Sequence, residues 1–230
     1  MKNRTINGFR IYAFKNKKNF LNEIKNKKKI LIAMNAEKIL KKNKILKDIV
    51  NENIGYPDGI GAVMALKQRK LESVKIPGVE LWLDLIMEFH KTKKFYFIGS
   101  SKDVIEATVE KLKKHYPNLD IVGFREGYLD IGEKEKLIDD LKIKNPDVVF
   151  VAQGSPRQEY LMHDLFIEYN ALYMGLGGSF DIYSARKKRA PALFLKYNIE
   201  WLYRLLKEPT RISRQLILVK FLFLLLIRKI

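Results

Sequence analysis

Apolar runs and amphipathic segments alternate along the middle of the chain. Short, almost wholly apolar runs predict buried strands, and the segments between them repeat apolar residues every three or four positions, as helices with one buried face do. Strands are expected at 29–35, 94–100, 119–124, 147–153 and 171–177, and helices at 37–50, 59–70, 79–91, 101–116, 133–144 and 155–169. Strands separated by such helices are typical of right-handed βαβ units. The pattern therefore predicts an α/β fold with a Rossmann-like parallel sheet flanked by helices.

The strand patterns stop after Gly178. The remaining chain, from about residue 190, predicts short helices that are broken at Pro191 and Pro209. We therefore expect two parts, an α/β domain over residues 1–189 and a helical appendage over residues 190–230.

The last segment of the appendage is the most apolar part of the chain. Eleven of the twelve residues from Leu216 to Ile227 are apolar, and only Lys220 interrupts them. A helix needs roughly 20 apolar residues to cross a bilayer, so this run is too short to do so. The basic residues around it favour an amphipathic segment that lies in the lipid headgroup region. A buried last helix or a contact between two copies of the chain is the alternative.

The charge of the chain is concentrated at its two ends. The net charge is +18, with 15 basic and 3 acidic side chains in residues 1–48 and 12 basic and 2 acidic ones in residues 186–230. Basic ends of this kind favour an anionic partner, which can be nucleic acid, anionic lipid or a phosphorylated substrate. A general lysine bias of the source is the alternative for residues 15–47.

Two absences narrow the class of protein. The chain has no cysteine, which excludes disulfides, thiolate catalysis and cysteine-bound metal sites, and suits a reducing cytosol. The basic N-terminal segment lacks the apolar core of a signal peptide, so we do not expect export.

Candidate binding residues follow the predicted strands, because ligands of open parallel sheets collect beyond the carboxyl ends of the strands. The residues at these positions are Asn35, Gly99, Gly154, Gly177 and Gly178. Glycine turns that lead into helices bind phosphate through free N–H groups. Ser100 and Ser155 also fit the first position of a capping box, which is a purely structural role.

Asp58 lies in the segment Tyr56–Gly59, whose composition predicts a turn. It can be a turn former or the N-cap of the helix at 59–70. Alternatively, it is a carboxylate placed beside a glycine-rich helix start as a general base.

Three arginines in the appendage are candidate phosphate ligands. Arg211 and Arg214 would share one face of a helix, and forked guanidinium groups suit a diphosphate. The alternative is a solvent-facing or lipid-facing stripe that includes Arg204. The histidines have no ligand spacing and Asp-x-Asp is missing, so we expect neither a metal nor another cofactor.

Several stretches together resemble the bacterial WecG/TagA/CpsF glycosyltransferase family. They are YPDGIGAV, PGVEL, YPNLDIVGFREGY, VVFVAQGSPRQE, GLGGSFDIYSARKKRAP and IEWLYRLLKEPTRISRQ, in this order. The resemblance implies an inverting, metal-independent enzyme that moves an N-acetylmannosamine-type sugar from UDP to N-acetylglucosamine on undecaprenyl diphosphate. It also implies a peripheral location on the cytoplasmic face of the plasma membrane, a role in cell-surface polysaccharide synthesis, and possible self-association.

The resemblance implies a role for each candidate. Asp58 would be the base that deprotonates the acceptor hydroxyl, and Asn35 and Gln158 would contact sugar. Arg204, Arg211 and Arg214 would stabilise the charge on departing UDP. The nucleotide pocket would be shaped by Gly99, Gly154, Gly177, Gly178 and Asp181.

The chain departs from the family pattern at several positions. Ala33 replaces a usual threonine, Lys75 a common arginine, Glu80 an aspartate and Ala185 a glycine. Because lysine cannot reproduce a bidentate arginine contact, glucose-type or uronic-acid donors stay open. A basic nucleic-acid-binding α/β protein without catalysis is the competing hypothesis, and it depends on charge alone.

Overall fold

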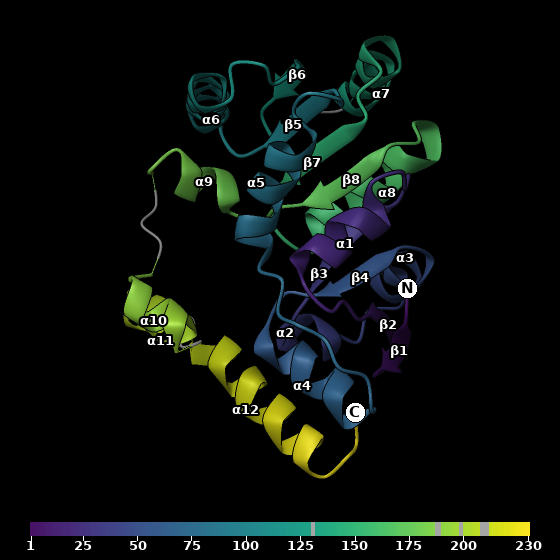
Figure 1. The fold of residues 1–230 in the computed structure, drawn as a ribbon, viewed down its shortest axis with the longest axis vertical. Helices are drawn as coiled ribbons and strands as arrows, with labels where there is room; N and C mark the ends of the chain where they lie inside the picture. The colour runs from purple at the N-terminus through teal and green to yellow at the C-terminus, as the bar shows by residue number, and fades with distance from the viewer. Residues whose placement is uncertain (130–131, 187–189, 198–199, 208–211) are drawn as a thin grey trace.

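A parallel sheet forms the centre of the computed structural model, which describes residues 1–129, 132–186, 190–197, 200–207 and 212–230 (Figure 1). Within these residues the sheet has six strands in the order β4-β3-β8-β7-β5-β6, and all neighbours are parallel. Its strands are β3 (Ile30–Met34), β4 (Ile54–Pro57), β5 (Phe95–Gly99), β6 (Ile121–Arg125), β7 (Val148–Ala152) and β8 (Leu172–Gly175). A separate antiparallel hairpin of β1 (Asn3–Ile6) and β2 (Phe9–Tyr12) precedes them. The predicted α/β fold is confirmed.

Helices flank the sheet, and the C-terminal helices extend beyond it (Figure 1). They are α1 (Lys17–Ile24), α2 (Ala36–Ile39), α3 (Lys44–Glu52), α4 (Ile60–Gln68), α5 (Gly78–Phe89), α6 (Lys102–His115), α7 (Glu133–Lys144), α8 (Arg157–Glu168), α9 (Ser179–Tyr183), α10 (Ala192–Lys196), α11 (Glu200–Lys207) and α12 (Ile212–Leu226). One face packs against α3, α7 and α8, and the other against α1, α5 and α6.

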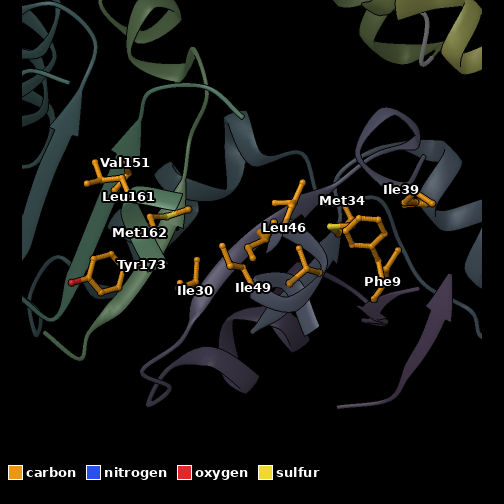
Figure 2. Close-up of a cluster of buried hydrophobic side chains, with 14 of the residues drawn as sticks. Phe9, Ile30, Met34, Ile39, Leu46, Ile49, Val151, Leu161, Met162 and Tyr173 are labelled. Carbon is orange, nitrogen blue, oxygen red and sulfur yellow. The ribbon is translucent and has the colours of Figure 1, made fainter. Parts of the chain in front are cut away.

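The apolar runs of the strands reflect burial on both faces. Successive strand residues point in opposite directions, so Ile30 and Ile32 enter one core cluster while Leu31 enters the other. Figure 2 shows the first cluster, in which Ile30 lies near Leu46 and Ile49 of α3. Because the inner strands are covered on both faces, they have no polar alternation, as expected for a parallel sheet, whereas the edge strand β6 is partly exposed.

The structure differs from the sequence-based expectations in the first 60 residues. The single helix expected at 37–50 is wrong, because the chain leaves α2 after Ile39 and a new N-cap at Asn43 starts α3. The Asn43 side chain accepts a hydrogen bond from the N–H of Leu46, which is a local helix-start signal. The hairpin, α1 and β4 were not expected at all.

The appendage returns to the body of the protein at its end. Helix α12 lies alongside α2 and α4 (Figure 1). Phe221 and Leu225 of α12 are buried in the first core cluster. The other face of α12 is apolar and exposed at Ile212, Leu216, Val219, Leu222, Phe223 and Leu226. No helix in the described residues has the length and hydropathy that a membrane span requires.

Candidate active site

The carboxyl ends of β5 and β7 form the point where the sheet topology reverses. From β5 the chain passes through α6 to β6, and from β7 it passes through α8 to β8 on the opposite side. Such a switch point opens a crevice in which ligands of α/β proteins bind. The N-termini of α6 and α8, two long helices, lie at this point, and the positive ends of their dipoles favour an anion there.

Gly99 allows the two loops of this crevice to approach each other. Its φ is +134°, and a Cβ at this position would overlap the carbonyl group of Ala152 on β7. The N–H of Ser100 donates to the same carbonyl oxygen at 2.9 Å. The loop after β6 closes the other side, because the N–H of Gly127 donates to the Ser100 carbonyl and Gln153 donates to the Gly127 carbonyl.

The expected capping boxes are wrong at both serines. Ser101, rather than Ser100, is the N-cap of α6, and Pro156, rather than Ser155, is the N-cap of α8; neither makes a side-chain cap hydrogen bond. Ser100 has a φ of +57°, a left-handed conformation that is unusual outside glycine. The turn into α6 therefore starts one residue later than the pattern suggests.

Asp58 and Asn35 lie side by side at the ends of neighbouring strands. Met34 of β3 is paired with Pro57 of β4, so the two polar residues follow directly at the same edge of the sheet. The backbone N–H of Asp58 donates to the Met34 carbonyl at 3.0 Å. Asn35 caps α2, where its Oδ1 accepts from the N–H of Lys38 at 2.9 Å.

The Asp58 carboxylate is held by another helix than the one expected. Gly59 is the N-cap of α4, so the prediction that Asp58 caps this helix is wrong. Instead, Oδ1 of Asp58 accepts a hydrogen bond of 2.6 Å from the N–H of Gly78, the first residue of α5. A carboxylate at the N-terminus of a 12-residue helix is stabilised by the helix dipole. Its position is thus set by a main-chain donor.

A buried tyrosine lies close to this carboxylate. Tyr56 is fully buried, and its hydroxyl has no hydrogen-bond partner among the described residues. Burial, together with the negative charges of Asp58 and Glu159, raises the pKa of Tyr56 well above its usual value, so the hydroxyl stays protonated. A Cβ at Gly78 would come within 2.9 Å of the hydroxyl oxygen, which leaves room only for glycine.

Gln158 supports the glycine turn after β8. The side chain is 5% exposed, and its Oε1 accepts from the N–H of Gly177 at 2.8 Å. Gly177 has a left-handed φ of +58°, Gly178 is the N-cap of α9, and Asp181 lies in the first turn of that helix. Gly154 has a φ of +78° in the turn before α8. The structure thus places these residues around the carboxyl ends of β7 and β8.

A buried ion pair, which the sequence analysis did not predict, joins α2 to α8. Nζ of Lys38 and Oε1 of Glu159 are 2.6 Å apart, and the two side chains are only 6% and 1% exposed. Burial opposes ionisation of Glu159, but the charge of Lys38 and its hydrogen bond outweigh this effect and hold the pKa of Glu159 below its usual value. The position of Lys38 thus favours the ionised form of Glu159. No sequence signal marks it beyond the position of Glu159 next to Gln158.

The appendage arginines are described only in part. Arg211 lies outside the described residues, and of Arg204 in α11 and Arg214 in α12 only the backbone is described. What connects α12 to the site is Phe221, whose ring packs on Gly61, three residues after Asp58. The end of the chain is held by hydrogen bonds from Gln68 to the Leu225 carbonyl and from Arg69 to the Ile230 carbonyl.

Comparisons with known proteins point to one family. The sequence model of the glycosyl transferase WecG/TagA/CpsF family matches residues 4–230. An N-acetylglucosaminyldiphosphoundecaprenol N-acetyl-beta-D-mannosaminyltransferase from Bacillus spizizenii is 40% identical over 171 residues, which are 72% of this chain and 65% of the relative. The chain thus spans somewhat less than two thirds of the length of this relative.

Proposed function

The chain belongs to the WecG/TagA/CpsF family of glycosyl transferases, and on this basis we propose that it transfers an N-acetylmannosamine-type sugar from a UDP-sugar to N-acetylglucosamine on undecaprenyl diphosphate. The transfer inverts the anomeric carbon, requires no metal ion, and serves cell-surface polysaccharide synthesis. The name of the Bacillus relative supports this donor and acceptor. The observation that carries the proposal is the Asp58 carboxylate, held at the carboxyl edge of the sheet beside Asn35.

We place the donor across the crevice between β5 and β7. Its diphosphate meets the N–H groups at the starts of α6 and α8, since helix N-termini attract phosphate. The left-handed glycines in the turns after β5, β7 and β8 keep these turns short and free of side chains, so a nucleotide can approach the backbone. The nucleotide pocket then contains the predicted residues Gly99, Gly154, Gly177, Gly178 and Asp181.

Asp58 acts as the general base in this proposal. It takes the proton of the acceptor hydroxyl while that oxygen forms a bond to the anomeric carbon, and the bond from this carbon to the UDP oxygen breaks. The electron pair of the broken bond stays on UDP, whose charge is stabilised by Arg204, Arg211 and Arg214. Asn35, the neighbour of Asp58 at the strand ends, donates a hydrogen bond to a sugar. Gln158 is buried, with its amide oxygen on the Gly177 N–H, so it acts on the sugar through the glycine turn that it supports.

A membrane surface is the proposed partner of the appendage. The exposed side of α12 is apolar, and the chain end is strongly basic, which together suit the interface of an anionic bilayer. Docking there brings the enzyme to its lipid-linked acceptor. We therefore propose a peripheral location on the cytoplasmic face of the membrane, with residues 190–230 as the membrane-associating part.

The substitution Asp58→Asn tests whether Asp58 is the general base. The new amide oxygen can still accept the hydrogen bond from Gly78, so folding should be retained, whereas the ability to take a proton is lost. We expect turnover to fall by about 10²-fold to 10⁴-fold. The measurement is UDP release from UDP-N-acetylmannosamine with a short-chain lipid diphosphate N-acetylglucosamine as acceptor.

The matched control is Asp164→Asn, which makes the same chemical change at an exposed aspartate of α8. Turnover of this variant should equal that of the parent. Parent-like turnover of Asp58→Asn would show that Asp58 is not the base. A parent protein that transfers none of a panel of UDP-sugars, but binds nucleic acid with a steep dependence on salt, would replace the whole proposal.

A further inference from the structure

The Lys38–Glu159 pair is the most deeply buried ion pair among the described residues. The other ion pairs have side chains that are at least about one fifth exposed, whereas these two are 6% and 1% exposed. Lys38 belongs to α2 and Glu159 to α8, and the two are 121 residues apart in the chain. The pair therefore joins the helix that follows β3 to the helix that precedes β8, and these two strands are neighbours in the sheet.

Stability alone gives no reason for such a pair. Moving two charges out of water costs more than their attraction usually returns, and apolar residues of similar volume often replace a buried pair without loss of stability. An ion pair fixes the distance and direction between two atoms, whereas an apolar contact does not. A role in positioning is therefore the more informative explanation.

The pair is part of a continuous chain of contacts through the proposed site. On one side, the backbone N–H of Lys38 donates to Oδ1 of Asn35 at 2.9 Å. On the other side, Oε1 of Glu159 accepts from Nε2 of Gln158 at 3.4 Å, and Oε1 of Gln158 accepts from Gly177 at 2.8 Å.

The charge of Glu159 also sets the orientation of the neighbouring amide. A carboxylate only accepts hydrogen bonds, so it attracts the NH₂ group of Gln158 and leaves the amide oxygen directed toward the Gly177 N–H. Without the negative charge of Glu159, this orientation of the Gln158 amide is less strongly favoured. The turn that contains Gly177 would then lose its support.

We propose that Lys38 and Glu159 are positioning residues, which fix the distance between the Asn35 end of the active site and the Gln158–Gly177 end. The two ends flank the path from the acceptor to the donor, so a shift between them misaligns the reacting groups. The proposal rests on the proposed transferase function. Neither residue touches substrate, since both side chains are buried.

The test compares the single variants Lys38→Met and Glu159→Gln with the double variant. Each single variant leaves one buried charge without its partner and should lower the melting temperature. The double variant has no unpaired charge and nearly the parent's side-chain volume, so its melting temperature should stay within about 4 °C of the parent's. Its kcat should nevertheless fall by about 10²-fold, the effect of a small misplacement, with KM changed far less.

A second readout does not depend on activity. Hydrogen exchange followed by mass spectrometry reports the N–H of Gly177, which donates to Gln158. We expect faster exchange in peptides that cover residues 172–180 of the double variant. Because this readout needs no substrate, failure to detect transfer in the parent would overturn the proposed function without affecting the positioning result.

Glu168→Gln is the matched control, since it removes a carboxylate from the same helix, where an exposed ion pair joins it to Lys142 at 3.3 Å. This variant should have the parent's kcat and the parent's rate of hydrogen exchange at residues 172–180. The proposal is overturned if the double variant keeps the parent's kcat and the parent's exchange at residues 172–180. It is equally overturned if kcat and exchange change as much in Glu168→Gln as in the double variant.

Discussion

The contact between Phe221 and Gly61 connects the end of the chain to the start of α4. Phe221 is 1% exposed, and its ring lies 3.0 Å from the position that a Cβ of Gly61 would occupy. Phe221 also belongs to the first core cluster, which includes Ala36 and Ile39 of α2. The exchange Phe221→Ala removes this contact and leaves the remaining chain unaltered.

The loss of stability caused by Phe221→Ala can be estimated because Phe221 is almost fully buried. Truncation of a buried phenylalanine to alanine costs about 3–5 kcal/mol. Outside the core contacts of α12, the described links at the chain end are the hydrogen bonds from Gln68 and Arg69. The strands and the other helices keep their own packing, so the loss should fall on the docking of α12. At about 1.4 kcal/mol for each factor of ten, the population with α12 detached should rise by about 10²-fold to about 4 × 10³-fold.

Hydrogen exchange measures this population directly. In Phe221→Ala we expect faster exchange in peptides from residues 212–230, while peptides from the strands keep the exchange rates of the parent. Phe223→Ala is the matched control, because Phe223 lies on the same helix and is 60% exposed. The reasoning is refuted if both variants exchange alike, or if Phe221→Ala loses protection in the whole sheet together with α12.

Three further predictions concern the outer side of α12, the buried tyrosine and the buried ion pair. Phe223→Glu together with Leu226→Glu should release the protein from phosphatidylglycerol vesicles in a flotation assay, whereas Ile167→Glu, an equally exposed apolar position on α8, should not. Tyr56→Phe removes a buried hydroxyl without a described partner, so the free energy of unfolding in urea should stay equal or rise by up to about 1 kcal/mol; a clear loss would reveal a partner. The folded protein holds the pKa of Glu159 below its usual value of 4.5, so the ionised carboxylate contributes its full stability above pH 4.5 and loses it as the pH falls through the folded pKa. In Glu159→Gln, the free energy of unfolding should therefore depend less on pH below about pH 4.5. An unchanged pH dependence in this range would contradict the prediction.

The central sheet could be predicted because its strands are buried on both faces. Runs such as 95–99 and 148–152 are apolar throughout, and the amphipathic segments between them leave few alternatives to βαβ units. The N-terminal hairpin was missed because β1 is only four residues long and its two central residues are exposed, which leaves no alternation to detect. Strand β4 was missed because its sequence, IGYP, contains a glycine and a proline, which are rare inside strands.

The candidate site was predictable where it depends on the ends of strands. Asn35 follows a strand that the sequence predicts. Asp58 was predicted only as part of a turn, because β4 was missed, so its place beside Asn35 became visible in the structure. The partners of Asp58 and Glu159 could not be predicted in the same way. Gly78 is 20 residues from Asp58, and Lys38 is 121 residues from Glu159, so these contacts depend on how whole helices pack on the sheet.

The anchor of the Asp58 carboxylate is a peptide N–H, and this has a consequence for how the enzyme can vary. Nineteen of the twenty amino acids carry this N–H, so a substitution at position 78 deletes no donor, although any side chain larger than hydrogen would press on the Tyr56 hydroxyl. Proline is the exception, because its nitrogen carries no hydrogen. The position of the Asp58 carboxylate therefore depends on the course of the main chain at α5. Relatives with the same main chain can keep this position even where the surrounding side chains differ.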